Sequence, residues 1–198
     1  MAKEEAAAAG AAAQEQWRGA VEARMPSTPA SAAWAHVASF GALHRYLPGI
    51  DVCELEAGAA GDGGGGRPGC VRYVASLAPG TTTGEVATWA REELLELDGA
   101  ARRLAYAVVG SNMGFRRYVA TMAVVADEED SPAAGGCRLV WAFECEPVQG
   151  WSRDGLLGYL DGAAKGMAAR IEEAVAAVAG AGAAVVGAGA GGDDAVAA

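Results

Sequence analysis

An arginine, a glutamate and two tyrosines occur where strand-like segments otherwise carry apolar or small residues: Arg72, Glu92, Tyr106 and Tyr118. Alternate residues of a strand point to one side, so all four side chains can face the interior of a sheet. A lone buried charge is costly, but an arginine–glutamate pair with tyrosine hydroxyls nearby is tolerated. The pattern leaves two interpretations, a functional pair inside a pocket or an ion pair that only seals one face of the sheet.

These residue types suit proton transfer on a small molecule. Arginine is permanently charged and presents a fork of donors, so Arg72 can hold and polarise an oxygen atom. A carboxylate such as Glu92 can take a proton from one atom and return it to another. The hydroxyls of Tyr106 and Tyr118 can orient a ligand or the glutamate.

The segments that carry these residues alternate with period two, which predicts strands. Their connections are short and rich in glycine, proline and aspartate, which indicates hairpins and an antiparallel meander. Seven strands are expected, over Gln16–Met25, Ile50–Ala57, Cys70–Leu77, Glu85–Leu97, Arg102–Val109, Phe115–Asp127 and Cys137–Pro147.

Helical spacing appears in three places. Ala30–Phe40 and Ala42–Leu47 predict two short helices after the first strand, with Thr28 as the expected N-cap of the first. Arg153–Val178 predicts a long helix with an apolar stripe, formed by Leu156, Leu160, Ala163, Met167, Ile171, Ala174 and Val178. A helix of that length needs a sheet to cover its stripe, so we expect an α+β fold with a sheet curved around the helix and a cavity between them.

The length of 198 residues suits one domain, expected over residues 16–179. Residues 1–15 and 180–198 are alanine- and glycine-rich and are expected to be disordered tails. We interpret Ala174–Gly192 as a helix end followed by a tail, not as a membrane anchor. The net charge of −10 argues against nucleic acid and anionic membranes as partners.

The four cysteines, Cys53, Cys70, Cys137 and Cys145, form no C-x-x-C pair, and the chain has two histidines. This spacing argues against a zinc site, and no metal is expected. Reduced, buried thiols in a cytoplasmic protein are the simplest interpretation.

Several motifs resemble the plant lachrymatory-factor synthases, which belong to the START and polyketide-cyclase-like superfamily (also called SRPBCC). They are GCVRYV at Gly69–Val74, TWAREELLELD at Thr88–Asp98, YVATM from Tyr118, LVWAFEC at Leu139–Cys145 and ALHRYLPGIDVCELEAG at Ala42–Gly58. The resemblance runs from about Trp17 to Ala177 in matching order. It implies a helix-grip fold: a seven-stranded curved antiparallel sheet around a long C-terminal helix, with two short helices after the first strand.

The resemblance also implies an activity and a site. Members of that family isomerise a small alkenyl sulfenic acid to a thial S-oxide by moving a proton, without a cofactor. Their catalytic arginine and glutamate match Arg72 and Glu92. Two supporting tyrosines match Tyr106 and Tyr118, and two lining positions match Leu43 and Trp141. Thr88 stands where the family carries a larger pocket residue. Phe143, on the same predicted inner face as Trp141, is a further expected substrate-binding residue.

The sequence departs from the family at Ala163–Ala164, where an aromatic residue is expected, and by the insertion Gly61–Gly66. With Thr88, these changes are expected to widen the pocket, so the substrate can differ. Three hypotheses remain open. The protein is a cofactor-free isomerase, a non-catalytic carrier of a small hydrophobic ligand such as a plant hormone or lipid, or a stress-related protein with an incidental pocket. The sequence identifies no protein partner, and no close match to the gate loops of hormone receptors is present.

Overall fold

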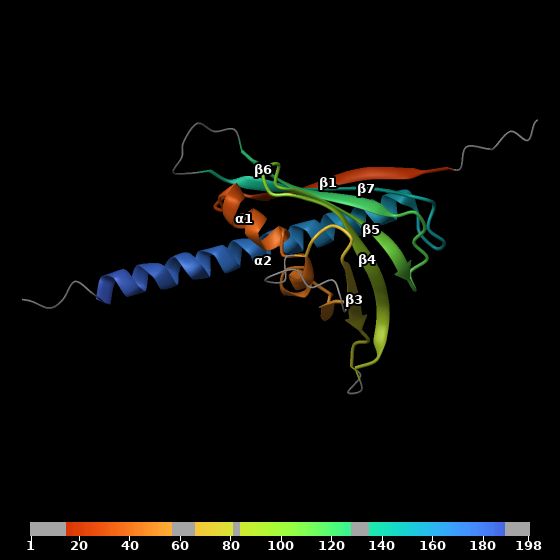
Figure 1. The fold of residues 1–198 in the computed structure, drawn as a ribbon, viewed down its shortest axis with the longest axis horizontal. Helices are drawn as coiled ribbons and strands as arrows, with labels where there is room; N and C mark the ends of the chain where they lie inside the picture. Colours follow the sequence, from red (N-terminus) through yellow and green to blue (C-terminus); the bar gives the residue numbers. More distant parts are fainter. Residues whose placement is uncertain (1–14, 57–65, 81–83, 128–134, 189–198) are drawn as a thin grey trace, which may run out of the picture.

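The alternating segments assemble into one curved sheet, which lies against a long helix (Figure 1). The computed structural model describes residues 15–56, 66–80, 84–127 and 135–188, with the backbone alone for residues 181–188. The sheet has seven strands: β1 (Trp17–Met25), β2 (Val52–Leu55), β3 (Val71–Leu77), β4 (Val86–Asp98), β5 (Arg103–Ser111), β6 (Val119–Ala126) and β7 (Cys137–Cys145).

The strand order is β1-β7-β6-β5-β4-β3-β2, and every neighbouring pair is antiparallel. Strands β2 to β7 therefore form the expected meander, and β1 joins it at the edge of β7. The expected interior positions of Arg72, Glu92, Tyr106 and Tyr118 are confirmed, because all four residues are buried. In β7 alternate residues from Cys137 to Cys145 are buried, and in β6 the buried positions include Ala120 and Met122. The predicted α+β fold is confirmed.

Three helical segments complete the fold: α1 (Ala30–Val37), the 3-10 helix η1 (Phe40–Arg45) and α2 (Arg153–Ala188). α2 packs mainly against β1 and β7, and α1 contacts β6 and α2. The side chains of α2 that face the sheet are fully buried, namely Leu156, Leu160, Ala164, Met167, Ala168 and Ile171. This stripe and the inner face of the sheet form one hydrophobic core.

Several boundaries differ from those expected. The strand expected from Phe115 begins at Val119. The second short helix, expected over Ala42–Leu47, lies two residues earlier, over Phe40–Arg45. Pro29 occupies the N-cap of α1, and Thr28 instead lies close to the Glu172 carboxylate of α2, with 3.5 Å between its hydroxyl and Oε1.

α2 continues beyond its expected end at Val178 to Ala188, so residues 180–188 of the expected tail are helical. Val178 does not belong to the buried stripe, because 72% of its surface is exposed. The expected tails at 1–14 and 189–198 lie outside the described residues, as do Ala57 and all but the last residue of the insertion Gly61–Gly66.

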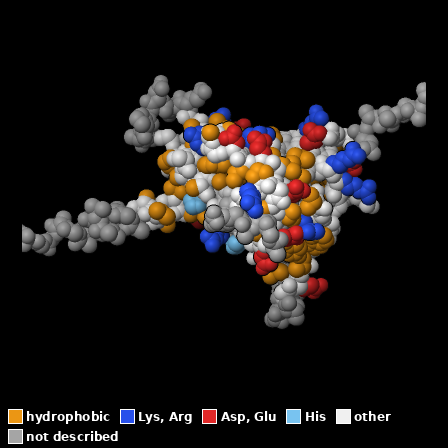
Figure 2. All heavy atoms as spheres, viewed as in Figure 1, with side chains coloured by type: hydrophobic (Ala, Val, Ile, Leu, Met, Phe, Trp, Pro, Cys, Tyr) orange, Lys and Arg blue, Asp and Glu red, His pale blue; other side chains and the backbone are white. Residues whose placement is uncertain are grey.

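The surface mixes charges of both signs. Arginines pair with carboxylates of neighbouring strands at the surface, as Arg18 does with Glu144 and Arg103 with Glu96. On the face shown in Figure 2, basic side chains lie among acidic and hydrophobic ones. Among the described residues, no helix is long and apolar enough to span a membrane.

Candidate functional site

Arg72 and Glu92 are direct cross-strand partners on β3 and β4. Arg72 Nε donates a hydrogen bond to Glu92 Oε2 at 2.7 Å, and both residues are buried, with 3% and 8% of their surface exposed. Glu92 Oε1 receives no hydrogen bond from the described residues. One carboxylate oxygen is therefore fixed by a charge, and the other is free to exchange a proton.

The Arg72 guanidinium is held from several sides. Nη1 donates to the carbonyl oxygen of Phe40 at 2.8 Å, and Cζ lies 3.9 Å from the centre of the Phe40 ring. The ring of Tyr106 lies 5.3 Å from the same atom. Cation–π contacts with two rings compensate part of the cost of burying the charge. The short helix η1, which begins at Phe40, thus fixes the position of the pair.

Irregularities in the β4–β5 pairing lie on both sides of Glu92. The register shifts between Arg91 and Glu92 and again between Leu94 and Glu96. Bulges bend a strand and redirect side chains, and they are frequent beside active sites. The residues that the register skips, Val109 and Leu95, lie exposed on the outer face, whereas Glu92 points inward.

Glu92 lines a small internal cavity of about 70 Å³ between the sheet and the helices. Most of its lining is apolar, and the polar atoms come from Glu92, three tyrosines and a tryptophan. The lining residues are Leu43, Leu47, Ile50, Val74, Ala90, Glu92, Tyr106, Val108, Met113, Phe115, Tyr118, Trp141, Tyr159 and Leu160. An apolar cavity with a few convergent polar groups is typical of a small-molecule site.

Burial raises the pKa of both Tyr106 and Tyr118 above the ordinary tyrosine value. The neighbouring phenol adds to the increase for Tyr106, and the Glu92 carboxylate adds to it for both. Both phenols therefore keep their protons at any physiological pH. They provide neutral hydroxyl groups that can donate a hydrogen bond to a ligand or to Glu92.

The indole of Trp141 supplies a free donor. Trp141 is 5% exposed and lines the cavity, and its Nε1 has no hydrogen-bond partner among the described residues. The indole lies near the Tyr106 hydroxyl and partly offsets the increase of that tyrosine's pKa, but the two groups do not reach hydrogen-bond geometry. A buried donor without a partner is costly, so a ligand atom that accepts this N–H would satisfy it.

The structure brings five of the expected site residues together on the cavity wall: Leu43, Glu92, Tyr106, Tyr118 and Trp141. Three others lie outside the lining. Arg72 contacts Glu92 rather than the cavity, which differs from the expected direct contact with a ligand oxygen. Phe143 stacks on Tyr118 with ring centres 6.0 Å apart, and Thr88 lies half-buried on β4 opposite Ser76.

Sequence reasoning missed several lining residues, among them Met113 and two aromatic residues, Phe115 and Tyr159. Met113 and Phe115 lie in the β5–β6 connection, which the alternation had partly assigned to a strand. Tyr159 lies one helical turn before Ala163, where an aromatic residue was expected. Residues four apart lie on the same face of a helix, so the position of Tyr159 four residues before Ala163 could have identified it as the aromatic lining residue.

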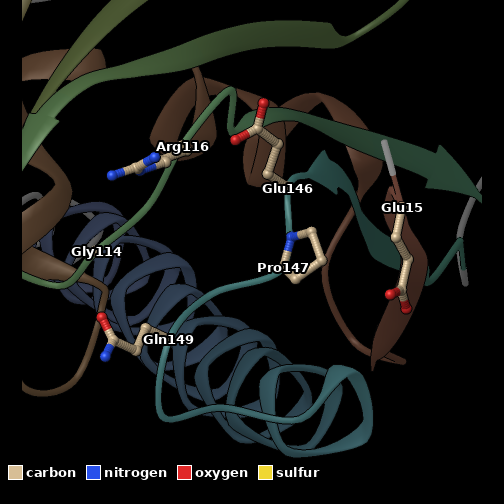
Figure 3. Close-up of a pocket in the computed structure, with 6 residues that line it drawn as sticks. All are labelled: Glu15, Gly114, Arg116, Glu146, Pro147 and Gln149. Atoms are coloured by element: carbon tan, nitrogen blue, oxygen red, sulfur yellow. The ribbon is translucent and has the colours of Figure 1, made fainter. Parts of the chain in front are cut away.

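A second, larger hollow lies on the other side of the β5–β6 connection (Figure 3). It is an open groove of about 480 Å³ lined by Glu15, Gly114, Arg116, Glu146, Pro147 and Gln149. Gly114 and Arg116 face this groove, whereas Met113 and Phe115 face the internal cavity. We assign the site to the cavity despite its smaller volume, because the buried polar groups converge there and Glu146 is already paired with Arg117.

Metal-binding side chains do not gather in the described part of the chain: no cluster there contains three or more His, Cys, Asp or Glu residues. All four cysteines are buried and unpaired. Burial raises the pKa of Cys137 to about 11 and also raises that of Cys145, so both thiols stay protonated and unreactive near neutral pH.

The fold and cavity can be compared with known proteins. Residues 8–181 match the family described as polyketide cyclase/dehydrase and lipid transport. The chain belongs to this family. The family description fits a helix-grip protein that binds a small hydrophobic ligand, and this member of the family has its cavity between the sheet and the helices.

Two solved bacterial structures share the fold of this family member. One is the protein XoxI from Bacillus cereus, with 18% sequence identity, a TM-score of 0.57, and coverage of 80% of this chain and 94% of that one. The other is an uncharacterised protein from Bacillus thuringiensis, also with 18% identity and a TM-score of 0.57, covering 79% and 98%. At this identity the likeness concerns the fold alone.

Proposed function

We propose that this protein is a cofactor-free isomerase that moves a proton on a small, mainly apolar substrate inside the cavity, as lachrymatory-factor synthases do. The observation that carries the proposal is the position of Glu92. Its carboxylate lines the cavity with one oxygen held by Arg72 at 2.7 Å, and the other oxygen has no hydrogen-bond partner in the described part of the chain. A fixed, desolvated carboxylate beside neutral donors is a suitable proton carrier.

The reaction on an alkenyl sulfenic acid balances without any other reagent. Glu92 takes the proton of the S–OH group, and the oxygen is left as an S-oxide. The C=C electron pair takes the proton back at the far carbon, while a C=S double bond forms. Glu92 ends as the carboxylate, so the net change is an isomerisation. In this proposal the Trp141 N–H and the hydroxyls of Tyr106 and Tyr118 hold the substrate oxygen.

Arg72 acts in this scheme as a positioning residue, because its guanidinium contacts Glu92 and Phe40 rather than the cavity. It keeps the carboxylate in one orientation through the hydrogen bond from Nε to Glu92 Oε2. Because the sequence departs from the family at Thr88 and Ala163, we propose that the carbon chain of the substrate can differ from that of the family's substrate. A plant origin is supported by the resemblance, and a cytoplasmic location by the four unpaired, buried thiols.

The test mixes purified protein with freshly generated alkenyl sulfenic acid and measures thial S-oxide. We expect Glu92→Gln to lower the rate by about 10²–10⁴-fold, because general acid–base groups contribute that much. Glu93→Gln is the matched control, since Glu93 is the next residue on β4 and lies on the opposite face. The proposal fails if the wild type forms no more product than the protein-free blank, or if Glu92→Gln matches the wild type.

The alternative is a non-catalytic carrier of a small hydrophobic ligand, which the lipid-transport part of the family description favours. Native mass spectrometry after mild purification separates the two functions. A stoichiometric ligand retained by a protein without turnover would support the carrier, and an empty cavity with turnover would support the enzyme.

A further inference from the structure

The closed cavity is small for a substrate. Its volume of about 70 Å³ compares with about 300–1,000 Å³ for pockets that enclose drug-sized ligands. A substrate of more than a few heavy atoms therefore fits only if a side chain of the wall moves.

Tyr159 is the lining residue that is freest to move. It is 53% exposed although it lines the cavity, whereas the other described lining residues are buried or half-buried. Tyr159 therefore borders both the cavity and the solvent. Burial and the Glu92 carboxylate raise its pKa, so the phenol is neutral and lies within electrostatic reach of the proposed proton carrier.

The surroundings of Tyr159 on α2 leave space for a rotation of its side chain. Its helix neighbours four residues before and three residues after are Gly155 and Gly162, which have no side chains. The ring meets Trp151 edge-to-face, with ring centres 5.6 Å apart, and Trp151 is itself 40% exposed. Exposed aromatic rings change rotamer rapidly.

We propose that Tyr159 is the specificity-determining wall of the cavity: its ring sets the largest ligand that the protein accepts. A ligand longer than the closed cavity enters by turning the ring outward, toward Trp151. The proposal rests on the proposed function, because it takes the cavity as the substrate site. It assigns the control of ligand size to α2 rather than to the half-buried Met113 and Phe115 of the opposite wall.

The experiment uses the linear primary alcohols from 1-propanol to 1-octanol as probes. Each has one oxygen that can accept the Trp141 N–H, followed by an apolar chain. The readout is the indole ¹H–¹⁵N signal of Trp141, identified by its loss in Trp141→Phe. We expect Tyr159→Ala to accept alcohols about two carbons longer than the wild type does. For an alcohol whose last two carbons are accommodated only by the variant, the gain in Kd is expected to be about 15-fold, because each buried CH₂ contributes about fourfold.

Two control variants isolate the effect of ring size. Tyr159→Phe keeps the ring and should match the wild type within about twofold in Kd, a change of less than 0.5 kcal/mol by RT ln 2. Val178→Ala removes an exposed side chain further along α2 and should leave the binding series unchanged. Tyr159→Leu replaces Tyr159→Ala if the alanine variant has lost its near-UV signal, since leucine is smaller than tyrosine but still covers the core.

The outcomes separate the two proposals. If alcohols bind the wild type and the length limit is the same in the folded Tyr159 variants, the role of Tyr159 is overturned and the cavity remains the site. If no alcohol shifts the Trp141 signal in any of the proteins, the cavity does not bind ligands, and the proposed function fails together with the role of Tyr159.

Discussion

At the scale of single residues, the Arg72–Glu92 pair is a stability problem as well as a candidate catalytic device. Each charge loses its hydration on burial, and the attraction between the two compensates only when the geometry is good and further polar contacts are present. Here those contacts come from the Phe40 carbonyl and from the rings of Phe40 and Tyr106. The pair is therefore tolerated rather than strongly stabilising, which is consistent with retention for function.

We predict a strongly non-additive response when this pair is removed. Arg72→Met leaves Glu92 buried without its partner and should destabilise the protein by about 3–5 kcal/mol, as should Glu92→Leu. The double variant leaves no unpaired charge and should be more stable than either single variant. Urea unfolding of the four proteins gives the coupling free energy.

The surface pair Arg103–Glu96 is the control, because both of its side chains are 43% exposed. Its coupling free energy should stay below about 1 kcal/mol. Equal effects of the double variant and the sum of the single variants at Arg72 and Glu92 would contradict the prediction.

At the scale of elements, close contact between α2 and the turn after η1 sets the position of the cavity wall. A Cβ atom added at Gly166 would lie 2.5 Å from Pro48 Cγ and 3.2 Å from Cδ. The absence of a side chain at Gly166 thus lets the turn approach the helix. At Gly162, one turn earlier, an added Cβ meets nothing within 4 Å. The two glycines share a helix but differ in what surrounds them.

We therefore expect opposite effects from the same substitution. Gly162→Ala should stabilise the protein by up to about 1 kcal/mol, because alanine has the higher helix propensity. Gly166→Ala should destabilise it by about 1–3 kcal/mol, because the added methyl group pushes the Pro48 turn away from α2. Thermal unfolding of both variants checks this prediction. If both substitutions shifted the unfolding temperature in the same direction, the Pro48 turn would be moving away from α2 without destabilising the protein, and the prediction would be wrong.

The sequence predicted the inner faces of the strands well, because burial imposes a period of two that Cys137–Cys145 displays without exception. It placed Arg72 beside Glu92 only as a possibility, since register depends on partners far along the chain. Tyr159 and Phe115 were missed for a different reason. Whether an aromatic residue at the rim of an element lines a cavity or faces solvent depends on the packing of other elements, not on local periodicity.

At the scale of the whole molecule, α2 is longer than the sheet that it packs against (Figure 1). Its buried stripe ends at Ile171, with Val175 still packed against the core, and residues 176–180 are exposed. The apolar face of a helix supplies most of its stability in a protein. Residues 176–180 of α2 therefore contribute little to the free energy of folding, and the boundary of the domain at residue 179 stays a prediction.

The last prediction concerns this boundary. A chain of residues 16–179 should unfold within about 2–4 °C of the full-length protein, the shift that a change of about 1 kcal/mol causes at this size. It should also give the same Trp141 response to 1-propanol. A chain that ends at residue 169 loses Ile171, which is fully buried, and should be destabilised by several kcal/mol or fail to fold. Differential scanning calorimetry of the three chains makes the comparison. If the 16–179 chain unfolded much earlier than the full-length protein, the exposed end of α2 or one of the two terminal segments would have to stabilise the domain through contacts beyond the core described here.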